Sequence, residues 1–429
     1  MSELAVAGGR ALFDGGWPDW PMHTDTTVDY ATRCLQSRRW AVSGPRLESP
    51  GFEERFADEF AGYLGVPHCV PTVNGTAALL IGLEALDLGP GDEVIVPGLT
   101  WVASASTVLA VNARPVIVDI QPHTLCIDPA AIVAAITPRT RAISLVHLYS
   151  SVADLDAITS ICDAHGLALI EDCAQAHGAA WDGRRVGAWG DVGTFSMQQT
   201  KLLTAGEGGA AVTRDERLYR RMYQLRSDGR SRVTSPHPGE MELSMSGEVM
   251  GSNYCMSELS AAVLSGQLLE LDAQHARRTH NAKLLDSYLE QLPGVTPIDA
   301  LSKVTRRTYY YYTFRISREA FAGNDAATVA GALRGETGAP FQPTYPSLPR
   351  HPLLRVHTKR RYTAVKDLDT VLAAEVPRSD EAYAEVVTLH HSALLAPPER
   401  MSVLAEAIGK VLRGAGELSR EAGDMDNPL

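Results

Sequence analysis

Residues 142–170 read AISLVHLYSSVADLDAITSICDAHGLALI and contain two apolar runs with a helical pattern between them. The runs cover 142–146 and 167–170, and the helical pattern covers 155–165. Near-continuous apolar strands joined by a helix are typical of a parallel sheet that helices cover on both faces. The same alternation extends over about residues 53–215, so the sequence predicts an α/β fold with a mostly parallel central sheet. Further strands are predicted over 93–96 and 115–118, and further helices over 77–86 and 129–136.

The chain has 429 residues, which is more than one hydrophobic core normally serves, so we expect two domains. After residue 270 the pattern changes to a long helical stretch over 259–292 and a tyrosine-rich strand over 307–314. We therefore predict a large domain and a smaller C-terminal α+β domain, preceded by an extended arm that contains Trp17 and Trp20 and packs on an apolar surface. The predicted limits are 1–25 for the arm, 26–270 for the large domain and 271–429 for the small domain.

The formal net charge is -12, which argues against nucleic acid or an anionic membrane as the main partner. No segment approaches the roughly 18 uninterrupted apolar residues of a membrane span, and the chain does not open with a basic stretch followed by an apolar run. The six cysteines show no CxxC pair and no zinc or iron-sulfur spacing, so we expect no metal. A cytoplasmic protein that acts on small molecules is the expectation.

Lys201 is the only lysine among the first 282 residues, and it lies in the segment FSMQQTKLLTAGEGG, residues 195–209. The chain has only six lysines among its 39 basic residues, so arginine is its ordinary surface cation. An amine can lose its proton and attack a carbonyl carbon, as in the Schiff base that holds pyridoxal phosphate, whereas a guanidinium cannot. The alternative is a solvated lysine in a polar, glycine-rich loop.

Several polar or aromatic residues follow predicted strands, where parallel sheets bind their ligands. Trp101 follows one strand, His147 and Tyr149 end another, and Asp172 ends a third. A carboxylate at this edge can keep a pyridine nitrogen protonated, because one charge-assisted hydrogen bond contributes ~1.5 to 3 kcal/mol, or about one to two pKa units. Asp172 is the candidate, with a helix cap as its alternative, and Glu171 points the other way and is expected to be structural.

Asn74-Gly75-Thr76 immediately precedes the predicted helix 77–86, so backbone N–H groups and the positive end of the helix dipole converge there. This pattern predicts an anion site, and its alternative is an ordinary N-cap. Dipole and cap together supply only ~1 to 2 kcal/mol, so a phosphate needs further donors. Ser196, five residues before Lys201, provides one.

Two further side chains fit an aromatic cofactor ring. Trp101 has the flat surface needed to stack on such a ring, although a core tryptophan is the alternative. Gln175, three residues after Asp172, has the reach to bond a phenolic oxygen on the same ring.

Together these segments resemble the DegT/DnrJ/EryC1/StrS family of fold-type I aminotransferases, over about residues 30–400. The resemblance implies that Lys201 forms a Schiff base with pyridoxal 5'-phosphate, that Asp172 pairs with the pyridine nitrogen, that Gln175 bonds the phenolic oxygen and that Trp101 stacks on the ring. It also implies a homodimer with shared sites, in which Gly75, Thr76 and Ser196 bind the phosphate together with Asn253 from the partner. The segments are 74–76, 97–101, 171–178, 195–209 and GSNYCMSE at 251–258.

A narrower resemblance concerns the substrate. Five segments look like the glutamine-dependent aminotransferases of aminocyclitol antibiotic biosynthesis, which aminate 2-deoxy-scyllo-inosose or scyllo-inosose. Ser150 replaces a glycine of the wider family and fits this branch, whereas residues 378–383 look unlike it. The substrate contacts expected on this basis are His147, Tyr149, His357, Lys359 and Arg360. The five segments are 146–150, 196–198, 308–310, 357–362 and 387–391.

The predicted function is therefore transfer of an amino group from L-glutamine to a keto-cyclitol by a pyridoxal-phosphate enzyme. Two alternatives stay open: an aminotransferase for a nucleotide-linked keto-sugar, and a catalytically silent regulator that binds pyridoxal phosphate. Family members that dehydrate sugars replace the lysine with histidine or add an iron-sulfur cysteine set, so Lys201 disfavours that activity.

Overall fold

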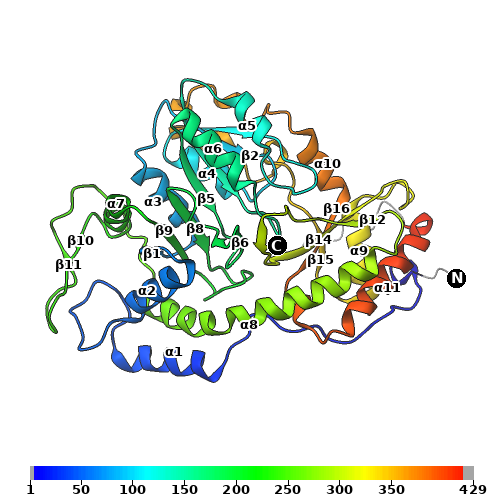
Figure 1. Cartoon of the computed structure of the whole chain (residues 1–429), viewed down its shortest axis with the longest axis horizontal. Helices are drawn as coiled ribbons and strands as arrows, with labels where there is room; N and C mark the ends of the chain where they lie inside the picture. The colour runs from blue at the N-terminus through cyan, green and yellow to red at the C-terminus, as the bar shows by residue number, and fades with distance from the viewer. Residues whose placement is uncertain (1–3, 419–429) are drawn as a thin grey trace.

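The computed structural model describes residues 4–418. Its main feature is a seven-stranded sheet with the strand order β1-β9-β8-β5-β4-β2-β3 (Figure 1). Strands β2, β3, β4, β5 and β8 run parallel to one another, and β9 is antiparallel to both β8 and β1. The predicted mostly parallel sheet is confirmed. The strands are β1 His68–Thr72, β2 Glu93–Pro97, β3 Arg114–Val118, β4 Thr140–Val146, β5 Ala168–Asp172, β8 Val192–Ser196 and β9 Gly209–Thr213.

Helices cover both faces of this sheet, because its strands alternate apolar side chains between two cores. In β2, Ile95 belongs to one core, which also contains residues of α2, α5, α6 and α8. Val94 and Val96 belong to the opposite core, which contains residues of α3 and α4, and α7 packs on α3. The helices are α1 Asp25–Ser37, α2 Phe52–Leu64, α3 Gly75–Ala85, α4 Ala103–Ala110, α5 Pro129–Ala135, α6 Leu155–His165 and α7 Glu216–Arg226.

A second, antiparallel sheet has the strand order β12-β14-β16-β15 and packs against α9 and α11 around its own core. Tyr309 and Tyr310 precede its strand β14, so the predicted tyrosine-rich strand begins four residues later than expected. The elements are β12 Val295–Pro297, β14 Tyr311–Ile316, β15 Phe341–Pro343, β16 Val386–His390, α9 Ala326–Thr337, α10 Pro377–Glu385 and α11 Arg400–Arg413. The short elements are β6 Ala180–Trp181, β7 Arg184–Arg185, β10 Ser231–Arg232, β11 Leu243–Ser244, β13 Val304–Arg306, η1 Ala5–Ala7, η2 Leu348–Arg350, η3 Val356–Thr358, η4 Arg360–Ala364, η5 Leu368–Val371, η6 Ala393–Leu395 and η7 Ala415–Glu417.

The helix α8, Glu258–Leu289, is 32 residues long and passes beneath both sheets in Figure 1. It packs against α1 and α2 in one part and against α11 and β12 in another. The predicted domain boundary at residue 270 falls inside this helix, so the division of the chain into domains stays a prediction.

The N-terminal arm runs along the C-terminal part of the chain before α1 begins. Leu4 is buried in the core of the second sheet, and Trp17 Nε1 donates to the carbonyl oxygen of Thr337 at 2.8 Å. Farther along, Trp20 Nε1 donates to the carbonyl oxygen of Gln199 at 2.9 Å. The arm therefore connects the C-terminal sheet with the loop that carries Lys201.

The helices of residues 4–418 include none with both the length and the apolar character that a membrane crossing requires. All six cysteines are free thiols, and five of them are buried.

Candidate active site

Lys201 lies in the loop between β8 and β9, and its own neighbours hold the loop in shape. Its backbone N–H donates to the carbonyl oxygen of Gln198 at 2.8 Å. The side-chain oxygen Oε1 of Gln198 accepts from the N–H and the hydroxyl of Thr200, both at 2.8 Å. Lys201 Nζ lies 4.3 Å from the centre of the Tyr310 ring, and the Tyr310 hydroxyl is 2.9 Å from Thr200 Oγ1.

Asp172 ends β5 at the carboxyl edge of the sheet and is buried, with 7% of its surface exposed. Its Oδ1 accepts from the N–H of Ala174 at 3.0 Å, and its Oδ2 accepts from the Ser104 hydroxyl at 3.4 Å. Burial raises the pKa of this carboxyl, whereas the Ala174 N–H and the positive charge of Lys201 lower it. A buried carboxylate with so few donors gains from a cationic partner, so this residue fits a protonated ring nitrogen.

The N-terminus of α3 meets the end of β8 and the start of β9. Asn74 caps the helix, with its Oδ1 accepting from the N–H of Ala77 at 2.8 Å. A Cβ on Gly75 would lie 2.7 Å from Ser196 Cβ, and one on Gly209 would lie 2.3 Å from the carbonyl carbon of Asn74. Because Gly75 and Gly209 have no side chain, the backbones of α3, β8 and β9 can approach one another closely. Thr76 is exposed beside the two glycines. Backbone donors, two hydroxyls and the positive helix end fit the phosphate of a cofactor.

Tyr345 lies next to both Trp101 and Gln175. The Trp101 ring is 38% exposed, and its centre is 5.7 Å from that of Tyr345 and 5.6 Å from that of His351. Gln175 Oε1 accepts from the N–H of Tyr149 at 2.8 Å, and its Nε2 donates to the Tyr345 hydroxyl at 3.4 Å. The bond from the Tyr149 N–H identifies Oε1 as the acceptor of the Gln175 amide. Nε2 is therefore the atom of Gln175 that can donate into the site.

His147 is fully buried, which disagrees with its expected place in a substrate pocket. Its Nε2 lies 3.2 Å from Glu171 Oε2, and its Nδ1 accepts from the N–H of Ala153 at 3.1 Å. Tyr149 is 2% exposed, and its hydroxyl accepts from the N–H of Tyr345 at 3.1 Å. The polar atoms of both side chains thus already have partners within the protein.

The other three expected substrate contacts are exposed side chains. His357 is exposed and pairs with Asp369 at 3.3 Å, and Lys359 lies over the Tyr362 ring at 5.7 Å. Arg360 is exposed. In the described part of the chain, no hydrogen bond or ring contact joins these three residues to Lys201, Asp172 or Trp101, so their role as substrate contacts stays a prediction.

Asn253 is exposed on the surface of the chain, where its Oδ1 accepts from the N–H of Cys255 at 3.2 Å. Its backbone bridges to Ser227, which directly follows α7. The side chain is therefore oriented by its own loop and remains accessible.

Sequence reasoning missed Ser104, Tyr310 and Tyr345 as site residues. Tyr310 lies in the segment 308–310 that resembles the cyclitol branch, but no role was assigned to it, and Ser104 lies three residues after Trp101 without a motif of its own. Tyr345 lies in a segment without a recognisable motif, and no local signal could have placed it beside Gln175.

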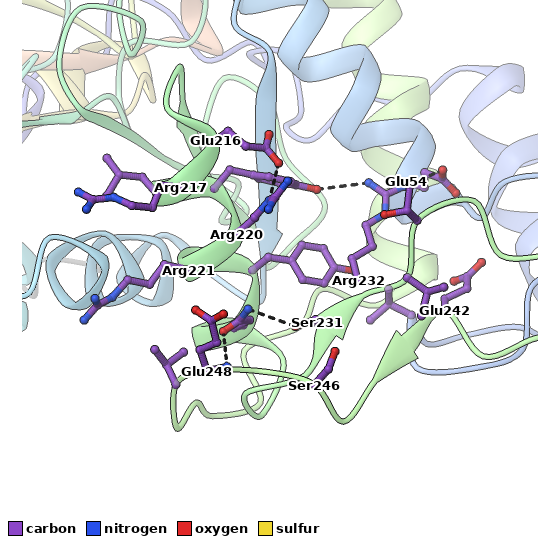
Figure 2. A pocket seen from close by; sticks show the side chains of 18 of the residues that line it. Glu54, Glu216, Arg217, Arg220, Arg221, Ser231, Arg232, Glu242, Ser246 and Glu248 are labelled. Atoms are coloured by element: carbon purple, nitrogen blue, oxygen red, sulfur yellow. Dashed lines mark hydrogen bonds and ion pairs between the residues drawn. The ribbon is translucent and has the colours of Figure 1, made fainter.

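A charged hollow and a cluster of possible metal ligands lie outside the arrangement of Lys201 and Asp172. A hollow of about 1540 Å³ between α2, α7 and β10–β11 contains many charges, but neither Lys201 nor Asp172 lines it (Figure 2). Its charges are largely paired, as in Arg220 with Glu216 and Arg232 with Glu54, both at 2.7 Å. His147, Glu171 and Cys173 lie close enough to share a cation, but backbone N–H groups already occupy both Glu171 oxygens.

This fold is also found in solved structures of aminotransferases. The fold matches the crystal structure of 3-amino-5-hydroxybenzoic acid synthase with a TM-score of 0.78 and 32% identity, covering 94% of this chain and all of the other. An aminotransferase from Psychrobacter cryohalolentis matches with a TM-score of 0.81 and 28% identity, again over 94% and 100%. The chain belongs to the DegT/DnrJ/EryC1/StrS aminotransferase family, whose model matches residues 21–407.

Relatives with specific names match over nearly the whole length. The L-glutamine:2-deoxy-scyllo-inosose aminotransferase of Streptoalloteichus tenebrarius is 49% identical over 97% of this chain and 99% of the relative. The L-glutamine:scyllo-inosose aminotransferase of Streptomyces griseus is 47% identical over 98% of this chain and 100% of the relative.

Proposed function

We propose that this protein is a pyridoxal-phosphate aminotransferase that moves an amino group from L-glutamine to a keto-cyclitol, with 2-deoxy-scyllo-inosose as the acceptor. The observation that carries the proposal is that Lys201 lies close enough to the buried Asp172, at the carboxyl edge of the sheet, for its charge to lower the pKa of that carboxyl. The charge of the only lysine among the first 282 residues acts on a buried carboxyl at the edge where parallel sheets bind ligands. The names and extent of the similar relatives support this choice of donor and acceptor.

The residues present fit the cofactor in four places. Pyridoxal phosphate supplies an aldehyde that accepts an amino group and a ring that withdraws electrons from the reacting carbon. Gly75, Thr76 and Ser196 would bind its phosphate, and Asp172 would hold a proton on its ring nitrogen. Gln175 Nε2 would donate to its phenolic oxygen, and Trp101 would cover one face of the ring.

Lys201 would bind the aldehyde carbon and later move the proton. Its Nζ would take up the proton that leaves the α carbon of the amino donor. The Tyr310 ring 4.3 Å away limits where the amine can go, so Nζ stays within reach of the reacting carbon.

A direct assay tests the proposal. Purified protein loaded with pyridoxal phosphate is incubated with L-glutamine and 2-deoxy-scyllo-inosose, and the amine product is detected by mass. We expect 2-deoxy-scyllo-inosamine to form. Thermal stabilisation by a nucleotide-linked keto-sugar in preference to the free keto-cyclitol would overturn the choice of acceptor. A protein that binds the cofactor but shows no absorbance change with any amino acid would be a silent regulator instead.

We further propose a homodimer in which Asn253 reaches the phosphate site of the partner. Asn253 is exposed, and large apolar side chains lie exposed beside its segment: Met250 is 94% and Trp40 is 58% exposed. The carbonyl oxygen of Trp40 accepts from the N–H of Glu258 at 3.1 Å, which places that tryptophan next to the same segment. Exposed apolar surface of this kind favours a protein partner.

Mixed dimers test this arrangement. Asn253→Ala should weaken cofactor retention, and a mixture of Asn253→Ala and Lys201→Ala chains should regain up to about a quarter of the activity, because half of the chains pair with the other kind and one of their two sites is intact. The absence of any regained activity, with mixed dimers demonstrated by native mass spectrometry, would contradict a site shared between subunits.

A further inference from the structure

The two carbonyl groups that precede Lys201 are held by residues from opposite ends of the chain. Trp20 Nε1, in the N-terminal arm, donates to the carbonyl oxygen of Gln199 at 2.9 Å. His391 Nε2, just after β16, lies 3.0 Å from the carbonyl oxygen of Thr200, and His390 Nε2 lies 3.3 Å from the same atom. None of these contacts involves the Lys201 amine itself.

The hydrogen-bond partners fix the protonation of the two histidines. A carbonyl oxygen only accepts, and its two lone pairs can take a hydrogen bond from each ring, so both Nε2 atoms carry the proton. The Nδ1 of His390 accepts from the N–H of Ser392 at 3.4 Å, which agrees with this tautomer. Burial lowers the pKa of His390 to about 4 and the pKa of His391 well below its usual range. Both rings are therefore neutral donors at physiological pH.

Trp20 is held in turn from two sides. Its ring meets the His391 ring edge-on, with 4.5 Å between their centres. The guanidinium of Arg278, in α8, lies 5.2 Å from the centre of the Trp20 ring. Arg278 is fully buried, and its Nε and Nη1 have no hydrogen-bond partner among residues 4–418. A desolvated cation of this kind gains from an aromatic face, so Arg278 favours the position that Trp20 occupies.

We propose that Trp20 and His391 are positioning residues for Lys201, fixing the peptides at 199 and 200 so that the amine stays aligned for proton transfer. The role of Lys201 on which this rests is the proposed function above. Lys201 N–H and Thr200 N–H both bond to Gln198, so a shift of the two intervening peptides moves the start of the lysine side chain. A misplacement of about 1 Å can reduce a rate about 100-fold. Loss of the contact made by Trp20 or by His391 should therefore lower the reaction rate.

The test compares Trp20→Phe with Trp17→Phe. Trp17 is a matched control, because it lies in the same arm and its Nε1 makes the same kind of bond, to the carbonyl oxygen of Thr337 at 2.8 Å. The first readout is amide hydrogen exchange of residues 197–202 in the full chain without cofactor. The second is kcat and KM for L-glutamine in the cofactor-loaded enzyme.

We expect Trp20→Phe to speed amide hydrogen exchange of residues 197–202 by about three- to tenfold, which corresponds to the loss of one hydrogen bond. The same substitution should lower kcat by about tenfold, with KM changed less than about twofold. Trp17→Phe should do neither. His391→Gln keeps a donor and should preserve most of the kcat that His391→Phe loses.

Equal exchange in the two tryptophan variants would overturn the proposal, and so would an unchanged kcat in Trp20→Phe. If the parent protein lacks glutamine turnover while exchange separates the variants as expected, the proposed function fails, and with it the catalytic part of this inference. The anchoring of the loop would then stand by itself.

Discussion

At the residue scale, the adjacent carboxylates of Glu171 and Asp172 differ in their surroundings and in their expected roles. Glu171 accepts from the N–H groups of Gly187, Trp189 and Gly190 at 2.7 to 2.8 Å and is fully buried. Asp172 has only one backbone donor and faces the carboxyl edge of the sheet. Strand geometry turns successive side chains to opposite faces, which is why neighbouring acids in β5 meet such different surroundings.

Asp172→Asn should separate activity from stability. We expect amination to fall by about 100-fold or more, because the ring nitrogen loses its anionic partner. Burial raises the pKa of Asp172, so the folded protein disfavours the charged carboxyl at neutral pH. The neutral amide removes this cost, and the cofactor-free variant should unfold at the same or a higher temperature than the parent.

Glu171→Gln is the matched comparison. Its amide nitrogen would face backbone N–H groups, so the free energy of unfolding should fall by about 1 to 3 kcal/mol. Urea unfolding of both variants, measured beside their amination rates, checks the pair. A destabilised Asp172→Asn with an unchanged rate would contradict the assignment of Asp172.

At the element scale, the site depends on how closely α3 approaches β8 and β9. Gly75→Ala should weaken cofactor binding by about 10- to 100-fold, because the new Cβ would lie 3.0 Å from the backbone Cα of Ser196. Gly62→Ala, in α2, is the control, since among residues 4–418 no atom outside the neighbouring backbone of its own helix lies within 4 Å of its Cβ position. Cofactor titration followed by absorbance measures both, and equal affinities in the two variants would count against this phosphate site.

The elements themselves were largely predictable from the sequence. The helix expected over 155–165 has those limits in α6, and the strand expected over 93–96 differs by one residue from β2. The hydrophobic periodicity of a segment depends only on the residues of that segment, so the bounds of these elements can be read from the sequence. The interior position of His147 was not predictable, because a histidine at a strand end gives no local sign that Glu171 and Ala153 will occupy both ring nitrogens.

At the scale of the whole molecule, the arm, α8 and the end of β16 meet behind the Lys201 loop. Trp20, Arg278 and His391 are separated by more than 100 residues in the chain, and no spacing rule links them. Lys201 and Asp172 could be singled out from chemistry and motif alone. Their supports could not, since contacts between distant segments follow from the packing of the two sheets.

The buried histidines predict a dependence of stability on pH. Burial lowers the pKa of His177 to about 3 and that of His390 to about 4, and it lowers the pKa of His275 and His391 well below the usual value. Below pH ~6.5 the unfolded chain binds protons that the folded chain does not, so stability falls with decreasing pH until the folded pKa is reached.

Each such histidine contributes a slope of up to ~1.4 kcal/mol per pH unit between about pH 6 and pH 4. Urea unfolding of the cofactor-free protein at pH 7, 6 and 5 measures the slope, and His390→Gln should reduce it. If His390→Gln leaves the slope unchanged, the His390 ring is not buried as a neutral group.

The central claim is that Lys201 holds the cofactor, and one measurement tests it most directly. The purified protein is loaded with pyridoxal phosphate, reduced with borohydride, digested and mapped by mass spectrometry. The account predicts a pyridoxyl adduct on the peptide that contains Lys201, absent in Lys201→Ala and retained in Lys283→Ala. An adduct on another lysine, or a protein that stays colourless and unlabelled in the presence of the cofactor, would contradict it.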